Sequence, residues 1–136
     1  LIIINNFVEH IENLKNIGKI VHQIKRGSYL IILTVDANSL GRKKFSSYWS
    51  GYHSPRHKVI FNSKSIKKIF PKVKKIKFKQ IRIYDPFTNI ISISNLIKQV
   101  MHNFTLADMF KITYFLLYLF VDSRRKNKIL MIVKKV

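Results

Sequence analysis

Apolar residues spaced three or four positions apart mark the first element that the sequence predicts. From Asn6 to Lys25 they recur with the period of an amphipathic helix. Asn5 or Asn6 would cap the start of this helix, Glu9 lies in its first turn, and Gly27 would end it. We therefore expect an N-terminal helix that stops before the glycine.

The rest of the chain alternates between short apolar runs and polar or basic segments. These runs predict strands at 28–35, 57–61, 73–85, 110–121 and 128–136, and helices at 40–49 and 92–104. The strands at 57–61 and 73–85 would pair as a long basic hairpin arm, about residues 56–85. From residue 29 to residue 121 the order is β, short α, β, β, α, β, which predicts an α+β fold of the ferredoxin-like βαββαβ type.

This pattern divides the chain into three parts. Residues 1–27 would form an N-terminal helical extension, residues 28–121 an α+β RNA-binding domain that carries the arm, and residues 122–136 a basic C-terminal extension. The length of 136 residues leaves room for one domain, and an apolar fraction of 47% is sufficient for a core.

The net charge of the chain is the strongest indication of its binding partner. The formal net charge is +20, from 26 lysines and arginines against six acids. No acid lies between Asp36 and Asp85, whereas fourteen basic residues do. Such a field repels itself unless a polyanion neutralises it, so nucleic acid is the leading partner and an anionic membrane the second.

The segment from Lys64 to Lys79 concentrates this charge, with eight lysines in sixteen positions. A solvated surface is the ordinary interpretation of such a run. However, Ile, Phe and Val side chains are interleaved with the lysines and would be exposed on a free arm. We therefore expect RNA or a neighbouring protein to cover this segment.

The residues of the arm resemble the family of small-subunit ribosomal protein ten. An ungapped comparison with the family's arm and its second strand gives identical residues at Arg56, Val59, Lys67, Lys68, Ile81, Ile83, Asp85 and Pro86. Departures occur at Ser63 and Lys64 and at residues 69–72. In a rival register, residues 19–27 are similar to the end of the family's first helix, and residues 1–5 would then be its first strand.

The resemblance implies a structural protein in the head of the small ribosomal subunit, binding ribosomal RNA and neighbouring ribosomal proteins. About half of the residues are Phe, Tyr, Met, Ile, Asn or Lys, as an AT-rich organellar genome would encode, so we expect a mitochondrial, ribosome-bound protein. No cofactor and no homo-oligomer are expected. The predicted RNA-binding residues are Arg42, Lys43, Lys44, Tyr52, Arg56, Lys58, Lys64, Lys67, Lys68, Lys72, Lys74, Lys75, Arg124, Arg125 and Lys126.

Other chemistry has less support in the sequence. The chain has no cysteine, and neither a carboxylate nor another histidine is spaced as a metal partner for His10, His53 and His57, so no metal site is expected. Dispersed acids and the lack of a phosphate-binding glycine loop predict that the protein is not an enzyme.

The alternative function is a small basic membrane-associated subunit of a mitochondrial respiratory complex, with residues 112–121 against lipid. That run has only ten apolar or near-apolar residues, and a spanning helix needs about 20, so no stable membrane insertion is expected.

Overall fold

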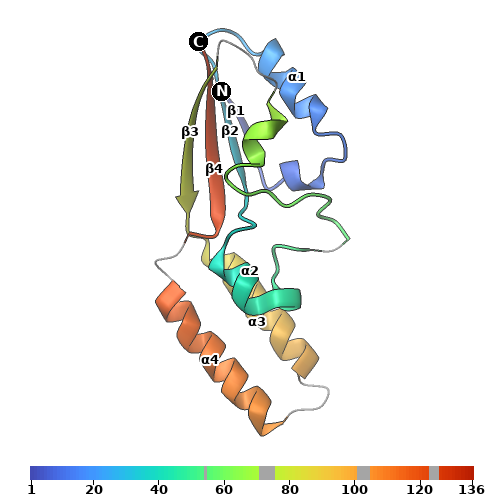
Figure 1. Ribbon diagram of the computed structural model, residues 1–136, viewed down its shortest axis with the longest axis vertical. Coiled ribbons are helices and arrows are strands. Elements are labelled where there is room, and N and C mark those ends of the chain that lie inside the picture. Colours follow the sequence, from blue (N-terminus) through green and yellow to red (C-terminus); the bar gives the residue numbers. More distant parts are fainter. Residues whose placement is uncertain (54, 71–75, 101–104, 123–125) are drawn as a thin grey trace.

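The computed structural model describes residues 1–53, 55–70, 76–100, 105–122 and 126–136. The molecule is elongated, with a β-sheet and one covering helix in one half and three helices beyond the ends of the strands in the other half (Figure 1). The two halves are called the sheet half and the helical half below.

The sheet has four strands in the order β1-β2-β4-β3. Their bounds are Ile2–Asn5 for β1, Tyr29–Val35 for β2, Ile76–Ile83 for β3 and Lys128–Lys135 for β4. Strands β1 and β2 are parallel and are joined through helix α1 (Lys15–Gln23), whereas β4 is antiparallel to both of its neighbours. The sheet is therefore mixed.

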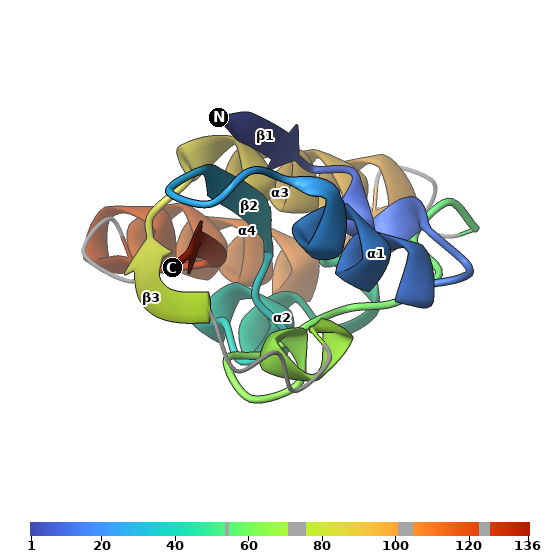
Figure 2. The same cartoon turned by 90° about the horizontal axis from the view of Figure 1, so that it is seen from above.

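The main core lies against one face of this sheet. Leu30 and Ile32 of β2 are fully buried and pair across the ladder with Val133 and Met131 of β4. Helix α1 lies on this side of the sheet, where it buries Ile17 and other apolar residues (Figure 2). Alternation along the strands thus produces one apolar face, as a half-covered sheet requires.

Three helices form the helical half: α2 (Leu40–Phe45), α3 (Pro86–Val100) and α4 (Leu106–Asp122). The Ser39 side chain caps α2 by accepting a hydrogen bond from Arg42 N at 3.2 Å. Among the described residues here, the buried apolar cluster includes Phe45 and Trp49.

The predicted α+β class is confirmed, because the described residues form a four-stranded mixed sheet and four α-helices, which is compatible with a ferredoxin-like arrangement. The strands expected at 28–35 and 128–136 are present as β2 and β4. Strands β1 and β4 arise in the stretches expected to be terminal extensions, yet both pair with β2.

The helix expected from Asn6 to Lys25 is shorter than predicted. It begins at Lys15, after strand β1 and a 3-10 turn at Val8–His10. The β-branched run Ile2–Ile4 pairs with β2, and Asn6 has a positive φ of 47° that ends the strand. A strand within residues 1–5 is what the rival register predicted.

The hairpin arm is a second correction. Strand β3 pairs with β4, and residues 57–61 form no strand but make a single bridge, from Phe61 to Asp36. Pairing with β4 places β3 at the edge of the main sheet, where Phe78 lies opposite the buried Val133. The partner of β3 is therefore β4 of the main sheet, and not the strand that was expected at residues 57–61.

The strand expected at Phe110–Val121 is also wrong, because these residues belong to helix α4. The sequence contains a helix-start signal that the strand prediction overlooked. Asp108 Oδ2 accepts a hydrogen bond from Thr105 N at 3.2 Å, and Thr105 Oγ1 accepts one from Asp108 N at 3.3 Å. This capping box starts a helix of 17 residues through the apolar run.

Candidate functional site

Helix α2 presents three consecutive basic side chains, Arg42, Lys43 and Lys44, all exposed. Arg42 Nε donates to the Tyr52 hydroxyl at 3.1 Å, and its guanidinium lies 5.8 Å from the centre of that ring. The structure therefore brings together two residues predicted to bind RNA. Lys44 Nζ instead lies 2.6 Å from the Tyr114 hydroxyl of α4.

Several apolar residues of the segment from Lys64 to Lys79 pack differently from what the sequence predicts. Ile66 and Ile69 are buried in a short 3-10 helix, and they join the main core together with Phe70. Lys67 and Lys68 of the same helix remain exposed, as does Lys64. For Ile66, Ile69 and Phe70 the expectation of an RNA or protein cover is thus wrong, because they pack in the chain's own core, whereas Phe78 remains 41% exposed.

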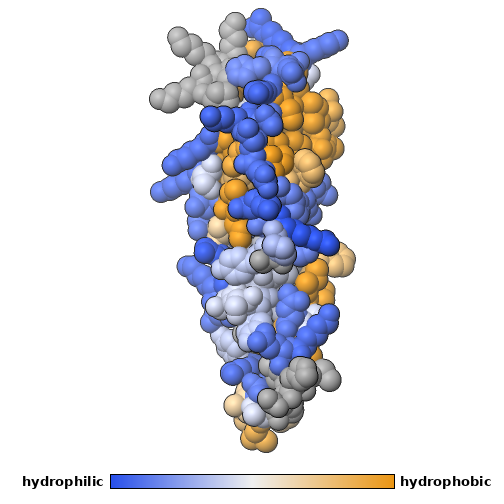
Figure 3. Space-filling view, turned by 90° about the vertical axis from the view of Figure 1, so that its right-hand side faces the viewer, coloured by the Kyte–Doolittle hydropathy of each residue, from blue (hydrophilic) through white to orange (hydrophobic). Residues whose placement is uncertain are grey.

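The other predicted basic residues fall into two groups. Arg56, Lys58 and Lys126 are exposed, and Lys58 Nζ lies 3.5 Å from the Glu12 carboxylate. The remaining five lie outside the described residues: Lys72, Lys74, Lys75, Arg124 and Arg125. Hydrophilic residues run along most of the face drawn in Figure 3, and hydrophobic residues gather at its upper right.

Few of these positive charges are neutralised within the described part of the chain. Its four ion pairs involve the carboxylates of Glu12, Asp36, Asp85 and Asp108. Lys43, Lys64, Lys67 and Lys68 occur in none of these pairs. Their charge therefore faces solvent, where a polyanion could reach it.

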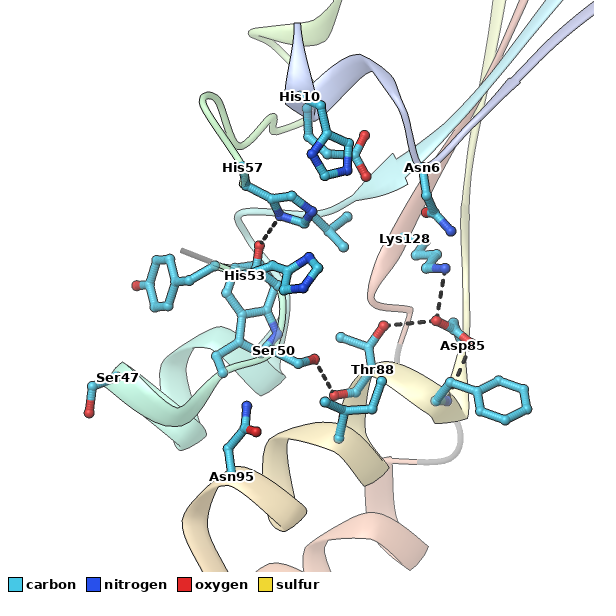
Figure 4. A pocket seen from close by; sticks show the side chains of 17 residues that line it. Asn6, His10, Ser47, Ser50, His53, His57, Asp85, Thr88, Asn95 and Lys128 are labelled. Atoms are coloured by element: carbon cyan, nitrogen blue, oxygen red, sulfur yellow. Dashed lines mark hydrogen bonds and ion pairs between the residues drawn. The ribbon is translucent and has the colours of Figure 1, made fainter. Parts of the chain in front are cut away.

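A cavity of about 770 Å³ lies where the sheet half meets the helical half (Figure 4). The β1–α1 connection, the loop after α2 and the start of α3 contribute to its wall. The lining side chains include His10, His53 and His57 on one side and Asp85 and Lys128 on another. Both acidic and basic groups thus line a single concave site.

The three histidines of this wall lie close together. The ring centres of His10 and His57 are 4.7 Å apart, and that of His53 is 5.2 Å from His57. The Glu9 carboxylate joins them: ligand atoms of Glu9, His10 and His57 all lie within 4.8 Å of one another. The conclusion that these histidines lack a carboxylate partner was therefore wrong, because folding supplies one that spacing along the chain does not show.

Main-chain hydrogen bonds bring the two segments of this cluster together. Lys58 N and Val59 N donate to the Glu9 carbonyl at 2.8 and 3.2 Å. His53 has a positive φ of 37°, which turns the chain sharply before His57. Burial is the largest cause that lowers the pKa of His53, followed by the neighbouring His57, Arg56 and His10.

Asp85 and Lys128 form the ion pair of the cavity, with Lys128 Nζ 2.9 Å from Asp85 Oδ2. Thr88 Oγ1 also donates to this oxygen, at 2.8 Å (Figure 4). Burial alone would raise the pKa of the Asp85 carboxyl, but the hydrogen bonds from Lys128 and Thr88 outweigh it and lower the pKa. Asp85 lies between the end of β3 at Ile83 and the start of α3 at Pro86.

No family model matches the chain, and no curated protein matches it. Among solved structures, it is similar to phosphoethanolamine N-methyltransferase 2 of Haemonchus contortus in complex with S-adenosyl-L-methionine, with a TM-score of 0.51 and 15% identity. The match covers 98% of this chain and 32% of that chain. A second structure of that enzyme, with phosphomonomethylethanolamine and S-adenosylhomocysteine, has the same identity and coverage and a TM-score of 0.48.

This likeness concerns the fold, and the chain spans about a third of the length of the methyltransferase. As far as the fold goes, it contradicts the prediction that the protein is not an enzyme, because a similar arrangement of strands and helices occurs within a solved enzyme. The dispersed acids did not exclude catalysis, since folding brings Glu9 and Asp85 to one cavity with His57 and Lys128.

Proposed function

We propose that the protein binds RNA, and that its site of action is the small subunit of a mitochondrial ribosome, in contact with ribosomal RNA and head proteins. The observation that carries this proposal is the excess of exposed lysine side chains outside the ion pairs of the described residues. Lys67 and Lys68 protrude from a 3-10 helix whose apolar residues anchor it in the core. Because this helix is anchored, its backbone loses less conformational entropy when Lys67 and Lys68 bind phosphates.

Salt dependence tests the RNA-binding part of this proposal. Each phosphate that a lysine neutralises releases counterions, so the logarithm of affinity falls with the logarithm of salt concentration. Changing Lys67 and Lys68 together to alanine should flatten this slope by roughly one unit for each phosphate that the variant no longer neutralises. The measurement is filter binding or fluorescence anisotropy with a small-subunit ribosomal RNA fragment at several salt concentrations.

A matched control removes the same charge from the helical half. Lys98 of α3 and Lys111 of α4 are exposed, and Lys111 already lies 3.3 Å from Asp108. Their double alanine variant should keep the wild-type slope. Equal slopes for the wild type and the Lys67/Lys68 variant would overturn this assignment of the RNA surface.

Sedimentation tests the ribosomal part. In mitochondrial extracts of the source organism, the protein should co-sediment with the small ribosomal subunit and leave it at high salt or after RNA digestion. If it sedimented apart from ribosomal RNA under low-salt conditions, the ribosomal proposal would fail even with RNA binding in vitro intact.

A second candidate is association with a membrane surface, which one observation favours. Helix α4 exposes a row of apolar side chains, and Leu106, Phe110 and Leu117 are 72%, 68% and 62% exposed. Within the described residues, no helix is long and apolar enough to span a bilayer. Retention in the membrane pellet after carbonate and salt washing would favour this candidate over the ribosome.

A further inference from the structure

The cluster of Glu9, His10 and His57 has the donor set of a transition-metal site. Two imidazole nitrogens and one carboxylate oxygen suit Zn²⁺ better than Ca²⁺ or Mg²⁺, which prefer oxygen ligands. We propose that these three side chains bind Zn²⁺ and leave its fourth coordination position open towards the cavity. The proposal goes beyond RNA binding and does not depend on it.

Hydrogen bonds prepare both histidines for this role. His10 Nδ1 lies 3.1 Å from the Arg56 carbonyl, and His57 Nδ1 lies 2.7 Å from the Gly51 carbonyl. A carbonyl oxygen only accepts hydrogen bonds, so in each pair Nδ1 is the donor. A metal binds the neutral form of imidazole, and with Nδ1 as the donor the lone pair of that form lies on Nε2, the atom free to bind a metal.

Glu9 is held in a comparable way. Its side chain is buried, and Thr34 Oγ1 donates to Oε2 at 2.9 Å. This bond orients the carboxylate and leaves Oε1 for the metal. All three ligands thus have an outer partner, an arrangement common around metal-binding side chains.

The distances require a modest contraction. Zn²⁺ holds nitrogen and oxygen ligands at about 2.0–2.2 Å, which in a tetrahedral site places ligand atoms about 3.4 Å apart. The ligand atoms here lie within 4.8 Å of one another. Small rotations of the two imidazole rings, which sit on separate segments, would close this gap.

The open position follows from the number of ligands. Three protein ligands with a water in the fourth place are typical of catalytic zinc, whereas structural zinc has four protein ligands. The His53 ring centre lies 6.5 Å from that of His10, farther than His57 does. His53 lines the same cavity outside the three-ligand group, and a water or small ligand would complete the coordination of the metal.

The test is titration of the metal-free full chain with Zn²⁺, by calorimetry or by competition with a chromophoric chelator. His10→Ala, His57→Ala and Glu9→Gln should each weaken binding by more than about 100-fold, because even outer partners contribute about 10–100-fold. Thr34→Val should weaken it by about 10-fold. Thr34→Val also keeps the test decisive if Glu9→Gln fails to fold.

His22→Ala is the matched control, since His22 is exposed on α1 and lies outside the cluster. It should bind Zn²⁺ as the wild type does. Wild-type affinity in His57→Ala, or an equal loss in His22→Ala, would overturn the site.

Cobalt substitution tests the open position. A four-coordinate Co²⁺ centre should give intense visible absorption that changes when azide or another small anion is added. His53→Ala should preserve this spectrum. Weak absorption typical of six-coordinate cobalt, or loss of the spectrum in His53→Ala, would overturn the three-ligand geometry.

Discussion

The sheet half and the helical half of this molecule bury their apolar residues to very different extents. Among the described residues, fourteen buried ones form the cluster against the sheet and four form the cluster among α2, α3 and the end of β2. Helix α4, by contrast, exposes much of its apolar surface. Within the described residues, the sheet half therefore buries more apolar side chains, whereas α4 presents an apolar surface suited to binding.

The largest effect should come from the sheet core. Met131 is fully buried in the middle of β4, between β2 and β3. Met131→Ala should lower the free energy of unfolding by about 2–5 kcal/mol, because it removes buried methylene groups and leaves a cavity. Denaturant unfolding measures this. A loss below about 1 kcal/mol would mean that the core collapses around the gap.

A smaller loss should follow from crowding the junction between the halves. A Cβ at Gly51 would lie 2.2 Å from the Trp49 ring, so the indole or the loop must move. Gly51→Ala should destabilise the protein by about 1–3 kcal/mol. The Gly51 carbonyl also accepts from His57, so the variant should shift the His57 ring resonances in NMR spectra. Unchanged resonances would contradict the tight packing of this loop.

Acid should weaken the connection between the halves. The folded state lowers the pKa of Asp85 below its ordinary value of 3.8, so the carboxylate stabilises the fold above that value. This contribution is lost as the pH falls through the lowered pKa. The melting temperature should therefore fall below about pH 4, and Asp85→Asn should reduce this dependence. An identical pH profile for the variant would contradict the role of the Lys128 pair.

The smallest effect should come from the exposed helix. Leu117 is 62% exposed on α4. Leu117→Ser should change the free energy of unfolding by about 0.5 kcal/mol or less, as a surface substitution does. Comparing it with Met131→Ala under the same conditions measures the contrast between the halves directly. A loss above about 2 kcal/mol would show that α4 is packed more tightly than its exposure indicates.

Part of the fold could be read from the sequence, where local signals were strong. The run at 28–35 is β-branched and bounded by Gly27, and it forms β2 as predicted. The apolar run at 110–121 was assigned to the wrong element because composition alone does not separate a buried strand from a helix, and the Thr105–Asp108 cap decided it.

The two candidate sites also differ in how far the sequence predicts them: the exposed lysines could be predicted, and the histidine cluster could not. Lysine side chains are rarely buried, so the exposed positions of Lys64, Lys67 and Lys68 could be predicted from residue type alone. His10 and His57 lie far apart in the chain, and no periodicity relates them. Their approach depends on hydrogen bonds from residues 58 and 59 to the Glu9 carbonyl.

The net charge of +20, the excess of lysine and the local preference of several segments follow directly from the amino-acid sequence, because they depend on residue type and near neighbours. Three contacts depend instead on the folded chain as a whole: the pairing of β3 with β4, the burial of Ile66 and Ile69 in the core, and the approach of Glu9 to the histidines. Each of these contacts closes a long loop, and whether it forms depends on how all the apolar surfaces are buried together.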